Sequence, residues 1–139
     1  MQKDFLAPKI QSFILADSVS RDETTGKHDI RGVLTSISTP SFPLQYESDI
    51  YVYVSMTNIR QDTTIEIGMK CNEHEFCDAA RELGRIVVGP SGDTTALAQT
   101  FFPIPEDSRR FPHQGIYLVT LTINDEEISS CRLVVYKKK

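Results

Sequence analysis

The stretch from Phe111 to Ile123 restricts the fold of this chain more than any other part of it. A proline turn at Pro112 and a glycine at Gly115 lead into an extended run. In that run alternate residues share one side, namely Tyr117, Val119, Leu121 and Ile123. This period of two predicts a buried strand with a tight entry. Tyr117 lies where β-sandwich domains often have a corner tyrosine.

Further short segments are predicted to be strands, and turn residues separate them. They are Ile10 to Asp17, His28 to Thr39, Ile50 to Thr57, Thr63 to Lys70, Leu83 to Val88, Thr94 to Phe102 and Ile128 to Tyr136. Gly32 is expected to mark a bulge or a close backbone approach. Almost no segment has a helical period, so the sequence predicts an all-β fold. We expect an antiparallel two-sheet β-sandwich with an immunoglobulin-like or C2-like Greek key.

Length and composition predict one domain, residues 1–139. A chain of 139 residues with 40% hydrophobic and 24% charged residues buries enough surface to fold without a metal or a disulfide. The net charge is −4, and without Lys137, Lys138 and Lys139 it is 12 − 19 = −7. Such an acidic body argues against a nucleic-acid partner. No apolar run approaches the ~20 residues of a membrane helix, so no membrane partner is expected.

The start of the chain has no basic flank before an apolar core, so no secretory signal is expected. The three cysteines, Cys71, Cys77 and Cys131, are few for a secreted scaffold. Together these features favour a reducing cytoplasm as the location.

One stretch has residues suited to metal binding: Cys71, His74 and Cys77 are evenly spaced, and thiolates and imidazole are zinc ligands. Cys131 is a conceivable fourth ligand. A single local trio is a weak zinc signal, so incidental cysteines and a surface histidine are the favoured interpretation. A Cys71–Cys77 disulfide is favoured even less in a reducing compartment. We therefore expect no metal and no cofactor.

Catalytic patterns are also missing from the sequence. The acidic residues are scattered through several turns without the close spacing that calcium needs. No serine lies between glycines at a strand-to-helix turn, and the histidines His28, His74 and His113 are far apart in sequence. We therefore expect no enzyme activity.

Two surface features are candidates for contacts with a partner. Tyr51 and Tyr53 share a strand side with Ser55 and Thr57, which makes a mixed aromatic and polar face and a possible interface. Arg109 and Arg110 form a small basic patch, although the preceding Glu106 and Asp107 favour local charge pairing.

Both ends of the chain resemble a known family. The first block is Pro8 to Asp17 with Gly26 to Val33 and Ile37, and the second is Phe111 to Tyr117 with the final hairpin. These blocks are similar to an uncharacterised bacterial family of small β-sandwich domains of unknown function. The resemblance implies the fold and supplies no catalytic residues.

The leading hypothesis for function is a non-catalytic binding or scaffolding module for a protein partner or for self-association. The alternatives are a small-molecule or carbohydrate-binding module, and a metal-binding domain or enzyme that uses Cys71, His74 and Cys77. The sequence leaves the partner and the oligomeric state open.

Overall fold

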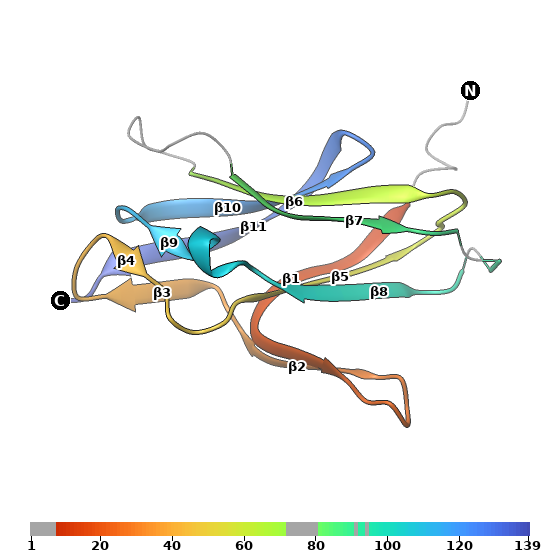
Figure 1. Cartoon of the computed structure of the whole chain (residues 1–139), viewed down its shortest axis with the longest axis horizontal. Coiled ribbons are helices and arrows are strands. Elements are labelled where there is room, and N and C mark those ends of the chain that lie inside the picture. The colour runs from red at the N-terminus through yellow and green to blue at the C-terminus, as the bar shows by residue number, and fades with distance from the viewer. Residues whose placement is uncertain (1–7, 72–80, 91, 94) are drawn as a thin grey trace.

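The computed structural model describes residues 8–71, 81–90, 92, 93 and 95–139, and most of them lie in strands (Figure 1). In chain order the strands are β1 (Lys9–Arg21), β2 (His28–Val33), β3 (Ser36–Thr39), β4 (Leu44–Gln45), β5 (Tyr51–Thr57), β6 (Thr63–Cys71), β7 (Arg81–Val88), β8 (Ala98–Pro103), β9 (Arg110–Phe111), β10 (Gly115–Ile123) and β11 (Glu126–Lys137). A short 3₁₀ turn, η1 (Glu106–Ser108), precedes β9.

Two sheets pack face to face. One sheet has four strands in the order β2-β1-β5-β8, all antiparallel. The other has five strands in the order β3-β11-β10-β6-β7, and its β3–β11 pair is parallel. Strands β4 and β9 form a small ribbon at one end of the sandwich (Figure 1). This arrangement confirms the predicted all-β sandwich, whereas the immunoglobulin-like or C2-like Greek key stays a prediction.

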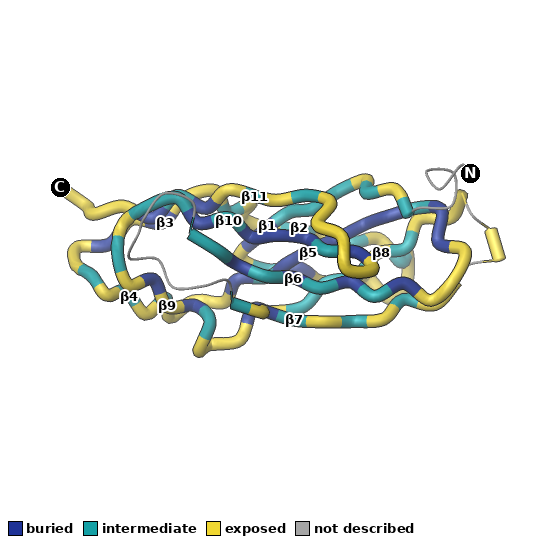
Figure 2. Tube along the Cα trace, turned by 90° about the horizontal axis from the view of Figure 1, so that it is seen from above, coloured by how far each residue is buried: buried dark blue, intermediate teal, exposed yellow. Residues whose placement is uncertain are grey.

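The core lies between the sheets and follows the predicted alternation. Buried residues recur along the central strands, as Figure 2 shows. In β5 they include Val52 and Val54, and in β10 they include Val119 and Leu121, which are fully buried. Burying one such side chain contributes about 1.5–3 kcal/mol. The alternation seen in the sequence therefore identifies which sides of β5 and β10 face the core.

Tyr117 forms the predicted tyrosine corner at the entry to β10. Its hydroxyl donates a hydrogen bond to the His113 backbone carbonyl, 2.6 Å away. Its ring packs edge-on against Phe111, with 5.0 Å between the ring centroids, and both side chains are buried. The tyrosine thus fixes the turn that leads into the central strand.

The segment His28 to Thr39 is not the single strand that the sequence predicts. It forms β2, which pairs with β1 in the four-stranded sheet, and β3, which pairs with β11 in the five-stranded sheet. Gly32 has a positive φ of 66°, and a Cβ at this position would overlap the Asp17 side chain. The expected close approach at Gly32 is therefore confirmed, and the chain changes sheets directly after it.

Strand β1 is shared between two partners, and this places an arm over the outer face of the sandwich. It pairs with β5 from Lys9 to Ala16 and with β2 from Ala16 to Arg21. Beyond Ala16 the β1–β2 hairpin therefore extends past the sheet, and its end lies below β8 in Figure 1.

Candidate functional site

The end of the β1–β2 hairpin covers an aromatic cluster on the outer face of the four-stranded sheet. The His28 ring lies 5.5 Å from the Tyr53 ring and 5.5 Å from the Phe101 ring. The Tyr51 ring lies 6.4 Å from the Phe101 ring. Tyr53 is only 6% exposed and Tyr51 is half-buried. The predicted interface face is thus largely occupied by the chain's own hairpin, and Tyr51 is the member of the pair that keeps accessible surface.

A small polar cavity lies between this hairpin and β8. We call it the hairpin pocket, and its volume is about 360 Å³. It is lined by Arg21, Gly26, His28, Leu97, Gln99, Thr100 and Phe101. The Gln99 Nε2 donates a hydrogen bond to the Tyr53 hydroxyl, 2.6 Å away, so the cluster holds the β8 side of the pocket in place.

The backbone of β8 offers unpaired groups beside this pocket. The Ile104 amide donates to the Ile50 carbonyl over 2.7 Å, and the register continues without a break along β8. Hydrogen-bonded and non-hydrogen-bonded pairs alternate in an antiparallel ladder. The N–H and C=O groups of Gln99 and Phe101 therefore point away from β5. Pro103 is the next residue whose backbone points away from β5, so its lack of an N–H removes no hydrogen bond between β8 and β5.

The other open edges have features that oppose pairing with another chain. The part of β1 that β2 does not cover begins with Lys9 and has a register shift between Ile10 and Ser12. Strand β7 contains Arg81, Glu82 and Arg85 and a register shift at its pairing with β6. Strand β2 contains Asp29, Arg31 and the left-handed Gly32. Strand β3 has only four residues and ends next to Pro40. Strand β8 has the sequence AQTFFP and no charged residue.

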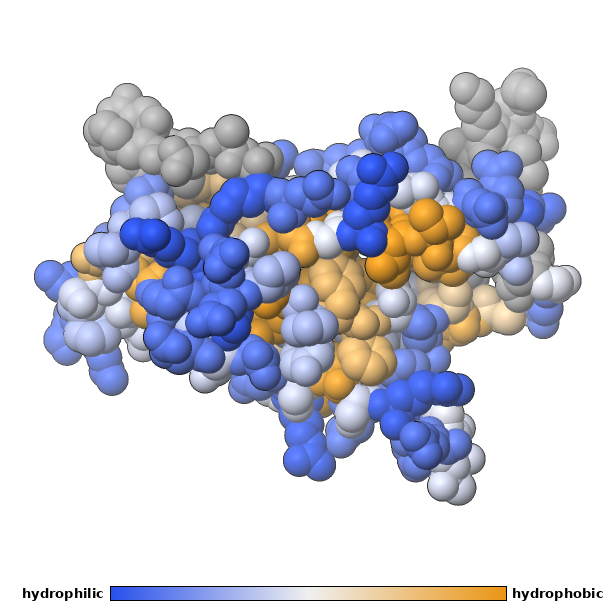
Figure 3. All heavy atoms as spheres, viewed as in Figure 1, coloured by the Kyte–Doolittle hydropathy of each residue, from blue (hydrophilic) through white to orange (hydrophobic). Residues whose placement is uncertain are grey.

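Apolar side chains gather along the same edge of the sandwich. Figure 3 shows them between the positions of β7 and β8. Val87 on β7 and Leu97 before β8 are exposed, and Phe101 and Phe102 are half-buried. The Phe102 ring packs over Gly84 of β7, where a Cβ would lie 2.7 Å from the ring. This edge therefore combines an unpaired backbone with an apolar surface.

A second cavity, of about 570 Å³ and mostly apolar, lies where the chain passes from β2 to β3. Phe13, Leu34, Cys131 and Val134 contribute to its lining. The Cys131 thiol is free and donates a hydrogen bond to the Phe13 carbonyl over 3.1 Å. Burial raises the pKa of Cys131 to about 11, so the thiol is an unreactive, partly buried group, as its alternation with Leu133 and Val135 suggests.

The structure does not assemble the candidate metal site from its described part. Cys71 is disulfide-bonded, so its sulfur is not a thiolate ligand, while His74 and Cys77 lie outside the described residues. Among the residues that are described, no cluster of three or more His, Cys, Asp or Glu side chains is arranged to hold a metal ion. His28 and His113 contact different aromatic residues, and the structure does not join them in one site.

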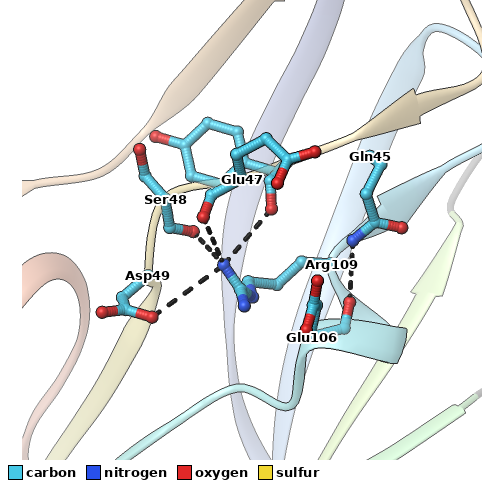
Figure 4. Close-up of polar contacts among 7 residues, drawn as sticks. Gln45, Glu47, Ser48, Asp49, Glu106 and Arg109 are labelled. Atoms are coloured by element: carbon cyan, nitrogen blue, oxygen red, sulfur yellow. Dashed lines mark hydrogen bonds and ion pairs between the residues drawn. The ribbon is translucent and has the colours of Figure 1, made fainter.

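Arg109 is not part of a basic surface patch. It is buried, and its Nη1 donates hydrogen bonds to the carbonyls of Tyr46, at 3.2 Å, Glu47, at 3.1 Å, and Ser48 (Figure 4). Its ion pair, at 3.9 Å, is with Asp49 rather than with Glu106 or Asp107. The arginine therefore anchors the segment that leads into β5, while Arg110 remains exposed.

Sequence reasoning did not identify Arg21, and it considered His28 only as one of three histidines that are far apart in sequence. Both residues flank a polar segment that is typical of a surface turn. A usable signal was present in β1, where apolar residues occupy both sides of the strand. Ile14 and Ala16 are the outward-facing members, and they pack in the cluster with Tyr53. Apolar residues on the outer side of a sheet indicate that another part of the chain covers it.

A family of unknown function, DUF6941, has a model that matches residues 11–136. The chain belongs to DUF6941. No curated protein matches this DUF6941 sequence. No helix in the described part of the DUF6941 domain has the length and apolar character needed to cross a bilayer.

Solved structures share the fold of the DUF6941 domain at low sequence identity. The alkylpurine DNA glycosylase AlkC of Pseudomonas fluorescens, bound to DNA containing an abasic site analog, aligns with a TM-score of 0.52 and 13% identity. That alignment covers 93% of this chain and 30% of AlkC. A β-glucosidase from Listeria innocua aligns with a TM-score of 0.53 and 10% identity, over 90% of this chain and 16% of the enzyme. The DUF6941 chain thus spans less than a third of these proteins, and the likeness shows the fold alone.

Proposed function

We propose that this DUF6941 domain is a non-catalytic binding module that takes an extended segment of a partner protein along the free edge of β8. The observation that supports the proposal most directly is the difference between β8 and the other sheet edges. Strand β8 has no charged residue, and the backbone groups of Gln99 and Phe101 point outward from it. Strand addition uses such groups for main-chain hydrogen bonds and neighbouring pockets for side chains.

The proposal includes no nucleic-acid or membrane partner. The chain has a net charge of −4, and a duplex of DNA repels an acidic protein unless a basic surface is present. Arg109, one of the two residues of the expected basic patch, is buried, so only Arg110 of that pair lies at the surface. The apolar strip of Val87, Leu97 and Phe102 beside β8 instead suits the side chains of a protein segment.

Selection from a library of random 12-residue peptides tests the proposal with the full chain as bait. Selected peptides are synthesised, and their dissociation constants are measured by fluorescence anisotropy. The decisive variant is Gln99→Pro, which removes an outward N–H without removing a bond to β5. Loss of one backbone hydrogen bond together with the steric clash of the ring weakens binding by roughly tenfold, or about 1.4 kcal/mol.

Gln99→Ala is the matched control, because it loses the same side-chain bond to Tyr53 and keeps the N–H. It should bind within about twofold of the wild type, and thermal melting checks that both variants fold. Light scattering on the same proteins identifies self-association, since a dimer that forms through β8 is lost in the proline variant. A library that yields no binding sequence, or equal binding by the two variants, overturns the proposal.

The cavity beside Cys131 supports a small-molecule-binding module as a second candidate function. Its volume of about 570 Å³ lies within the roughly 300–1,000 Å³ of ligand pockets, and its lining is mostly apolar. The fluorescent dye 1-anilinonaphthalene-8-sulfonate, whose aromatic body suits an apolar lining, should bind with a 1:1 stoichiometry. Leu34→Gln, which places a polar side chain in the lining, should abolish that binding, and unchanged dye binding removes this candidate.

The same proposal includes a bacterial source and a cytoplasmic location. One feature of the structure argues against the cytoplasmic location. Cys71 is disulfide-bonded, and a reducing cytoplasm does not maintain structural disulfides. Cells that express the full chain are quenched in acid, and the protein is then unfolded in denaturant and alkylated, so that mass measurement counts every free thiol, including the buried Cys131. Three alkylated cysteines support a reducing compartment, and one alkylated cysteine contradicts it.

A further inference from the structure

The hairpin pocket beside β8 contains an unpaired positive charge. Arg21 is exposed, and its guanidinium makes no hydrogen bond or ion pair with any residue that the structure describes. The pocket lining includes no carboxylate. Arg31, at the other side of the hairpin, differs in this respect because it is paired with Asp29 over 3.1 Å. The pocket therefore has a cation without its counter-charge.

His28 adds a directed hydrogen-bond donor to the same pocket. Its Nδ1 is buried and has no hydrogen-bond partner, while its ring is held between Tyr53 and Phe101. A buried N–H without a partner is rarer in proteins than an unpaired acceptor. A ring hydrogen is therefore assigned to Nε2, and His28 lines the pocket. Arg21 and His28 together present donors and no acceptor group of their own.

The pairing pattern of β8 determines which residues of an added strand reach these donors. Gln99 and Phe101 direct their backbone groups to the free edge, and their side chains line the hairpin pocket. In an antiparallel ladder, residues of a hydrogen-bonded pair lie directly opposite each other with Cα atoms about 5.5 Å apart and side chains on the same face. The residue opposite Gln99 or Phe101 therefore projects its side chain over the pocket.

We propose that the hairpin pocket selects an aspartate or glutamate of the partner segment, whose carboxylate accepts hydrogen bonds from Arg21 and from the His28 Nε2–H. This inference rests on the proposed strand addition at β8 and adds the chemistry of the partner: an extended peptide with one acidic side chain on the face that carries Gln99. A second copy of this chain does not meet this requirement through β8 itself, because AQTFFP has no acidic residue.

The experiment compares each selected peptide with a version in which its acidic residue is replaced by the amide, Glu→Gln or Asp→Asn. For the wild-type chain the amide peptide should bind about tenfold more weakly, because hydrogen bonds to a charged group are stronger than neutral ones. For Arg21→Gln the two peptides should bind equally within about twofold. Arg31→Gln removes the same charge from the same hairpin outside the pocket, and it should keep the discrimination of the wild type.

His28→Phe provides a second measurement, since phenylalanine keeps the ring packing on Tyr53 and Phe101 and loses the donor. It should reduce the preference for the acidic peptide about twofold without lowering the melting temperature. Equal binding of acidic and amide peptides to the wild type overturns this inference and leaves strand addition standing, provided that Gln99→Pro still weakens binding. Failure of every peptide to bind overturns the proposed function itself.

Discussion

Replacing Arg109 by methionine tests whether this arginine stabilises the fold from the inside. The guanidinium Nη1 donates to three backbone carbonyls, those of Tyr46, Glu47 and Ser48, while the residue is 7% exposed. Methionine has a similar length and no donor, so Arg109→Met leaves these carbonyls without their partner. We therefore expect a loss of stability and no change in fold.

The size of the effect follows from the contacts. One Nη1 has two hydrogens, so the three carbonyls share about two full bonds, and each bond to a charged donor contributes about 1.5–3 kcal/mol. The ion pair with the mostly exposed Asp49 adds less than about 1 kcal/mol. The buried Nε of Arg109 has no partner, and removing it returns about 1 kcal/mol. With the lower value for each bond, the free energy of unfolding should fall by about 3 kcal/mol and the melting temperature by roughly 10 °C.

Urea denaturation followed by tyrosine fluorescence measures this difference. Arg110→Met is the matched control, since Arg110 is exposed and its replacement should change the free energy of unfolding by less than about 0.5 kcal/mol. Arg109→Lys should give an intermediate loss, because the ammonium keeps the charge but has a shorter reach. A fully stable Arg109→Met, or an equal loss in Arg110→Met, refutes the assignment of Arg109 as an internal anchor.

Further predictions concern other parts of the sandwich. Tyr117→Phe removes the hydrogen bond to the His113 carbonyl, so its free energy of unfolding at pH 7 should be about 1 kcal/mol lower in urea denaturation. Burial raises the pKa of Tyr117, so wild-type stability should fall as the pH rises from about 10 through the folded-state pKa, and Tyr117→Phe should fall less. Cys131 should react with Ellman's reagent at pH 8 only after unfolding, because burial raises its pKa to about 11. Gly84→Ala should cost about 2 kcal/mol through overlap with Phe102, whereas Gly92→Ala, with nothing within 4 Å, should be neutral in the same denaturation assay.

The sequence predicted the fold correctly where alternation of apolar and polar residues marks the buried face of a strand. The alternation in β5, β6 and β10 identified the core sides of these strands, and the turn before Tyr117 identified its corner. Such patterns are local, because successive side chains of a strand point to opposite faces of the sheet and only one face is buried. These parts of the fold therefore follow from residues that are close in sequence.

The sequence failed where the decisive contact is distant. Nothing local ends a strand between His28 and Thr39, and the division into β2 and β3 depends on pairing with β1 and β11. The acceptors of Arg109 are main-chain carbonyls about 60 residues earlier, which no side-chain pattern marks. The hairpin pocket exists because β1 leaves β5 at Ala16, so its residues could not be found from the polar segment alone.

The burial of Tyr53 and the free edge of β8 are linked by one side chain. Tyr53 accepts the amide hydrogen bond of Gln99, and the Gln99 backbone points to the free edge. His28 packs on the same tyrosine, so the hairpin and the edge are both held in place before a partner arrives. Ordering a side chain on binding costs about 0.5–1.5 kcal/mol, and a preorganised site avoids that cost. Tyr53 therefore positions the neighbouring edge of β8 for binding and does not itself contact the partner.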